Sequence, residues 1–71
     1  MLLESISKLM AYDLAKKAQR AIAAELKLQQ YYRQMADQAT NPKVKAVIKD
    51  LLLMEEMNEV LLRSLNQNLE P

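Results

Sequence analysis

Apolar and polar residues alternate at helical spacing along the whole chain, in two long segments with one short interruption. Residues 3–39 contain no helix breaker and are rich in alanine, leucine, lysine and glutamine, and residues 43–69 continue in the same manner. The interruption is Thr40-Asn41-Pro42, where asparagine suits a helix N-cap and proline suits the first helical position. The pattern predicts an all-α protein, with a single antiparallel two-helix hairpin domain over residues 1–71 and its turn at 40–42.

The two predicted helices differ in length. At about 1.5 Å per residue, an unbroken first helix would be roughly 55 Å long and the second roughly 40 Å, so the first would overhang. A helix that starts near Ser5 to Ser7 is the alternative for the first segment, because serine can cap a helix there.

Each predicted helix carries an apolar stripe that polar residues interrupt. In the first helix the stripe consists of Leu3, Ile6, Met10, Leu14, Ala18, Ala21, Glu25, Leu28, Tyr32, Met35 and Ala39. In the second helix, the face that contains Glu55 and Asn58 is otherwise apolar and consists of Val44, Val47, Ile48, Leu51, Leu62, Leu65 and Leu69. Outside that face lie Leu53, Met57, Val60 and Leu61. One partner helix could not cover so much apolar surface, so we expect a homodimer or higher homo-oligomer.

Length, composition and charge exclude several classes of protein. A chain of 71 residues buries too little surface to be comfortably stable alone, which again favours oligomerisation. It contains no cysteine and no histidine, so disulfides, thiol nucleophiles and histidine chemistry are excluded. A net charge of +1 with few aromatic residues argues against nucleic acid as a partner. The longest aliphatic run, Leu51 to Met54, is too short for a bilayer, so we expect no membrane association and a cytoplasmic location.

The charges are divided unevenly along the chain. Residues 1–49 hold nine basic and four acidic residues, a net charge of +5, whereas residues 50–71 hold one basic and five acidic residues, a net charge of −4. In an antiparallel assembly these two parts of the chain attract each other.

Two carboxylates, Glu25 and Glu55, stand within the apolar stripes. A buried, unpaired carboxylate is costly, so it needs a basic partner such as Lys27, Arg33 or Lys49, a position at the exposed edge, or a metal cation. Two hairpins in a four-helix bundle would bring together two copies of Glu25 and two of the segment 55–58. This resembles the di-iron carboxylate plan of one Glu from each of two helices and Glu-x-x-His from each of the other two, with Asn58 in place of histidine.

Four features together resemble one half of a ferritin or rubrerythrin bundle, and most of all the two-helix encapsulated-ferritin family. They are Glu25, the pair Tyr31-Tyr32, the turn 41–48 and Glu55-Glu56-Met57-Asn58. The resemblance implies a ferritin-like four-helix bundle formed by two subunits and oxidation of iron(II) at a shared di-iron centre. It makes Glu25 and Glu55 iron ligands, places Asn58 at the ligand histidine and makes Tyr32 the catalytic neighbour that supplies a hydrogen bond. It also implies ring-like assembly and an encapsulin-type shell, although nothing after Leu69 resembles a targeting tail.

The asparagine changes the expected metal chemistry. Its amide offers only a weak carbonyl oxygen, so an all-oxygen site would bind iron less firmly and lean toward Mn, Ca or Mg. Glu59, one turn beyond Glu55, could substitute as a ligand. A non-catalytic ferritin-like oligomerisation module and an amphipathic hairpin that acts on membranes or partner helices remain the alternatives.

Overall fold

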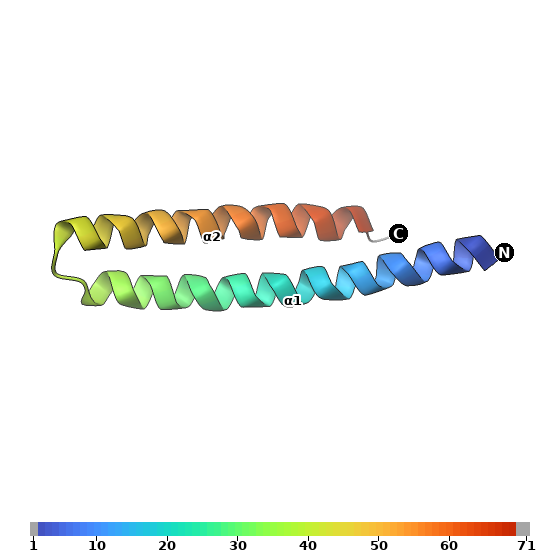
Figure 1. Ribbon diagram of the computed structural model, residues 1–71, viewed down its shortest axis with the longest axis horizontal. Helices are drawn as coiled ribbons and strands as arrows, with labels where there is room; N and C mark the ends of the chain where they lie inside the picture. Colours follow the sequence, from blue (N-terminus) through green and yellow to red (C-terminus); the bar gives the residue numbers. More distant parts are fainter. Residues whose placement is uncertain (1, 70–71) are drawn as a thin grey trace.

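The computed structural model describes residues 2–69 and contains two long helices. Helix α1 spans Leu2–Gln38 and helix α2 spans Pro42–Leu69. They run antiparallel and pack along each other as a hairpin about 60 Å long (Figure 1). The predicted all-α hairpin is therefore confirmed.

The two helices are joined through a short connection that ends in an N-cap. Residues 39–41 are non-helical, and Pro42 is the first residue of α2. The side-chain Oδ1 of Asn41 accepts hydrogen bonds from the backbone N of Lys43 at 2.9 Å and of Val44 at 3.3 Å. These bonds satisfy donors that a helix start leaves without intrahelical partners, which fixes where α2 begins.

Helix α1 is continuous through Ser5 and Ser7, so the unbroken form of the first helix is the observed one. The end of α2 at Leu69 lies against Ala11, and the preceding residues of α1 extend past it (Figure 1). Within residues 2–69, neither helix has a segment whose length and hydropathy would let it span a membrane.

The seam between the helices follows a regular heptad spacing on both sides. On α1 the buried or half-buried seam residues are Ala11, Ala15, Ala18, Ile22, Glu25, Gln29, Tyr32, Ala36 and Ala39. On α2 they are Lys45, Ile48, Leu52, Glu55, Glu59, Leu62, Asn66 and Leu69. Among residues 2–69, the buried apolar core consists of Ala18, Ile22, Ala36 and Ile48. The seam is thus narrow, rich in alanine and partly polar.

The predicted apolar stripe of α1 is only partly the seam. Ala18, Glu25, Tyr32 and Ala39 lie in it, but the large members of the stripe are exposed, with Met10 at 61% and Leu28 at 38% of their full exposure. The apolar arc of α1 is wide enough for a neighbouring helix to pack on either of two sides of it. Helix α2 packs on the alanine-rich side of that arc and leaves the leucine- and methionine-rich side uncovered.

The second predicted stripe is divided in the same way. Ile48, Leu62 and Leu69 lie in the seam, and Leu51 is half-buried beside it. Val44, Val47 and Leu65 are exposed, as are the apolar residues predicted outside the stripe, Leu53, Met57, Val60 and Leu61. One helix therefore covers only part of the apolar surface of α2, as the sequence predicted.

Many of the uncovered large side chains of both helices, although not all of them, lie on the same broad side of the hairpin. At about 100° per residue, Leu14, Leu28 and Met35 lie roughly a quarter turn from the α1 seam. A second set on α2 is rotated from its seam in the same sense. Leu51 and Leu65 lie roughly a quarter turn from the seam, and Val47, Met54 and Leu61 lie slightly more than a third of a turn from it. Because the helices are antiparallel, equal rotations bring both sets to one side. We call these residues, together with Ala21, the apolar face.

Candidate metal site

Glu25 stands in the middle of the α1 seam with one carboxylate oxygen unsatisfied. The residue is half-buried, and its Oε2 atom is shielded from solvent and accepts no hydrogen bond within the described residues. A buried acceptor without a partner costs about 1–3 kcal/mol, and more when it is charged. The single hairpin therefore leaves this oxygen of Glu25 without compensation.

Glu55 lies across the seam from Glu25. In an antiparallel hairpin that turns at residues 39–41 and sets Leu69 against Ala11, these two positions come to nearly the same level. Glu55 is half-buried, and its backbone oxygen accepts a hydrogen bond from Gln29 Nε2 at 3.4 Å. The structure thus brings the two predicted carboxylates, one from each helix, to the centre of the seam.

Glu59 is a different kind of carboxylate, because both of its oxygens are engaged. Gln29 Nε2 donates to its Oε1 at 2.8 Å, and Arg63 Nε donates to its Oε2 at 2.7 Å. These two hydrogen bonds, that of Gln29 first, lower the pKa of Glu59 from the ordinary value of 4.5, against an opposing effect of desolvation. Glu59 is consequently held ionised, and metal binding would have to displace at least one of these donors.

Gln29 organises this part of the seam and was not predicted from the sequence. It is the most buried polar residue, at 3% exposure, and bonds both to the α2 backbone at Glu55 and to Glu59. Its own Oε1 accepts a bond from Arg33 Nη2 at 3.4 Å. The heptad spacing of Ala18, Ile22, Glu25 and Gln29 indicates that Gln29 belongs to the seam, but the larger side chains of the adjacent stripe obscure this pattern.

The remaining predicted site residues do not join the carboxylate pair in one hairpin. Asn58 is exposed and lies on the side of α2 that carries the apolar face, away from the seam. Tyr32 is half-buried in the seam, about two helical turns from Glu25 towards the connection. Across residues 2–69, no three histidine, cysteine, aspartate or glutamate side chains gather as a metal-binding group. Glu70 and Pro71, which enter the prediction about a targeting tail, lie outside the described residues.

Comparison with protein-family models, with curated proteins and with solved structures finds no match to this chain. The structure is a two-helix antiparallel hairpin with a polar, alanine-rich seam.

Proposed function

We propose that two copies of this chain pair through the apolar face into a ferritin-like four-helix bundle, which takes up iron(II) at a shared carboxylate site and oxidises it. The observation that carries the proposal is the shielded, unbonded Oε2 of Glu25 opposite Glu55. A divalent cation is the partner whose charge and oxygen affinity match such a pair.

The distribution of the apolar face supports a second copy as its partner. On α2, Val47 and Leu65, and likewise Leu51 and Leu61, stand at equal sequence distances on either side of Glu56. On α1, Leu14 and Met35 stand at equal sequence distances on either side of a point between residues 24 and 25, and so do Ala21 and Leu28. A twofold axis across the helices at this level would set these apolar residues on apolar residues, with Met54 opposite Asn58.

The same axis would bring two copies each of Glu25 and Glu55 together near the centre of the bundle. Four carboxylates at close range repel one another, and cations would offset this repulsion. Iron(II) is here the substrate, and carboxylate oxygens bind it in both oxidation states, with dioxygen or peroxide as the electron acceptor. Asn58, on the apolar face side, would reach the site only within the dimer and would add a weak carbonyl ligand.

Tyr32 and Glu59 are assigned supporting parts. Tyr32 is half-buried in the seam and offers a hydroxyl that can hydrogen-bond a ligand carboxylate. Glu59 is a reserve ligand, because it becomes available only after Arg63 or Gln29 releases it. An all-oxygen set of this kind also accommodates Mn, Ca or Mg, so metal selectivity is part of the test.

Anaerobic titration with iron(II), combined with sedimentation velocity on the same samples, tests the proposal. We expect saturation at about one iron per chain, which is a pair of ions per dimer. Glu25→Ala should abolish saturable binding, and the matched change Glu56→Ala, at an exposed position, should not. Asn58→His should raise iron affinity and the rate of oxidation on admission of oxygen, whereas Asn68→His should leave both unchanged.

A non-catalytic oligomerisation module is the second candidate function. The exposure of Asn58 and the ion pair between Arg63 and Glu59 favour it, because each removes a metal ligand from the single hairpin. This function predicts a dimer that ignores iron, with no saturable binding in the wild type. It also predicts that Asn58→His changes nothing.

A further inference from the structure

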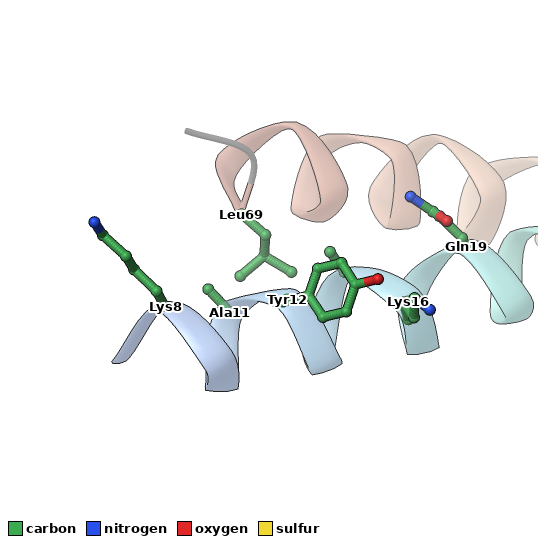
Figure 2. Close-up of a pocket in the computed structure, with 7 residues that line it drawn as sticks. Lys8, Ala11, Tyr12, Lys16, Gln19 and Leu69 are labelled. Carbon is green, nitrogen blue, oxygen red and sulfur yellow. The ribbon is translucent and has the colours of Figure 1, made fainter. Parts of the chain in front are cut away.

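A groove opens where α2 ends and α1 continues, at the end of the hairpin away from the turn. Its volume is about 660 Å³, and its floor consists of Ala11, Ala15 and Leu69. Leu69 points from α2 towards α1, and the ring of Tyr12 stands beside it (Figure 2). The groove exists because the α1 seam carries only the small side chains of Ala11 and Ala15 at the level where α2 ends.

The rim of the groove is cationic. Lys8 and Lys16 stand on either side of Tyr12 along α1, and Lys16 Nζ lies 4.9 Å from the centre of the Tyr12 ring (Figure 2). No acidic side chain lines the groove among residues 2–69. The neighbouring Asp13 is paired with Lys17 at 2.9 Å, so it does not neutralise the rim.

The cationic rim continues along α1. A shallower hollow, which shares Lys16 and Gln19 with the groove and is also lined by Arg20 and Ala23, extends it towards the middle of the helix. An apolar track with cations beside it matches a ligand that has an apolar chain and a single anionic head.

We propose that this groove binds a linear amphiphilic carboxylate, a fatty-acid-class anion, with its chain on the alanine floor and its carboxylate at the lysine ammonium groups. Charge complementarity selects the anion, because every titratable group that lines the rim among residues 2–69 is a cation or a phenol. The apolar floor selects a chain over a small anion. This inference goes beyond the proposed iron chemistry and does not depend on it.

The groove and the apolar face lie on different sides of the hairpin. At about 100° per residue, Tyr12 and Lys16 point nearly opposite to Met10 and Leu14 on α1. A dimer formed through the apolar face therefore leaves the groove open, and the carboxylate should bind the monomer and the dimer alike.

Calorimetric titration of the full chain with decanoate, below its micelle concentration, tests the inference. We expect one saturable site per chain, with binding at least ~10-fold weaker to decanol and to acetate, which lack the head charge and the chain respectively. The double variant Lys8→Glu, Lys16→Glu should lower decanoate affinity by ~10-fold or more. The matched variant Lys43→Glu, Lys49→Glu makes the same charge change at exposed positions near the turn and should bind as the wild type does.

Four results would overturn the proposal. Equal binding of acetate would mean simple ion pairing, and equal binding of decanol with no effect of Lys8→Glu, Lys16→Glu would mean nonspecific apolar adsorption. Loss of decanoate binding in Leu28→Asp would assign the ligand to the apolar face. Amide shifts in an NMR titration should be confined to the groove residues, and shifts spread along α2 would contradict the assignment. None of these results depends on iron binding.

Discussion

Replacement of Glu25 by leucine is expected to stabilise the metal-free protein and to abolish iron binding. The carboxylate stands half-buried in the seam with Oε2 shielded and unbonded, so its removal relieves an uncompensated polar group. Leucine also adds apolar surface between Ile22 and Gln29, where the seam is otherwise thin. Exchange of an unpaired buried charge for a packed apolar residue is often stabilising.

The expected gain is modest because Glu25 is only half-buried. An unsatisfied buried acceptor costs about 1–3 kcal/mol, and half exposure reduces this to about 1 kcal/mol. Partial burial of leucine contributes about 1 kcal/mol more. The sum is about 2 kcal/mol. For a chain of this size, each kcal/mol raises the thermal midpoint by about 4–8 °C.

Thermal unfolding followed by circular dichroism, in the presence of a chelator and at one protein concentration, measures this gain. Glu56→Leu is the matched control, since Glu56 is exposed and its replacement should change the midpoint little. A Glu25→Leu protein that melts below the wild type without metal would show that Glu25 has a stabilising partner in solution. The metal argument would then lose its starting point.

Five further outcomes are expected for the wild type and for single variants. Gln29→Leu should destabilise the hairpin by about 1 kcal/mol, with Gln30→Leu at an exposed position as control. Gln29 and Arg63 lower the pKa of Glu59, so the stabilisation that Glu59 contributes is present above the ordinary pKa of 4.5 and is lost as the pH falls through the lowered pKa. The loss of stability with falling pH should therefore be shallower in Gln29→Leu than in the wild type. Asn41→Ala should cost about 1 kcal/mol in chemical denaturation through loss of the N-cap, and Thr40→Ala should not. Leu28→Asp should weaken self-association by ~10-fold or more in sedimentation equilibrium, whereas Leu26→Asp, on the other side of α1, should leave it intact. The wild-type melting midpoint should rise with protein concentration, and a midpoint independent of concentration would argue against the dimer.

The sequence was sufficient to predict the hairpin, because Asn41-Pro42 is the only strong interruption in a chain of good helix formers. It also predicted the positions of Glu25 and Glu55 in the seam, because these two residues belong both to the predicted apolar stripes and to the observed seam. It did not predict which side of that arc α2 would cover, since leucine and methionine at Leu14, Leu28 and Met35 outweigh alanine in any hydropathy pattern. Gln29 and the exposure of Asn58 depend on that choice of side, so both were missed.

Association and metal binding are linked in the dimer proposed here. In a metal-free bundle, the central carboxylates of two copies repel each other and weaken the same interface that the apolar face stabilises. A cation that binds only the paired state removes this repulsion, so iron should strengthen association and association should strengthen iron binding by the same factor. Glu25→Leu tests this linkage, because it removes both the repelling carboxylates and the metal ligands. The variant should therefore dimerise more tightly than the metal-free wild type, and its association should no longer respond to iron.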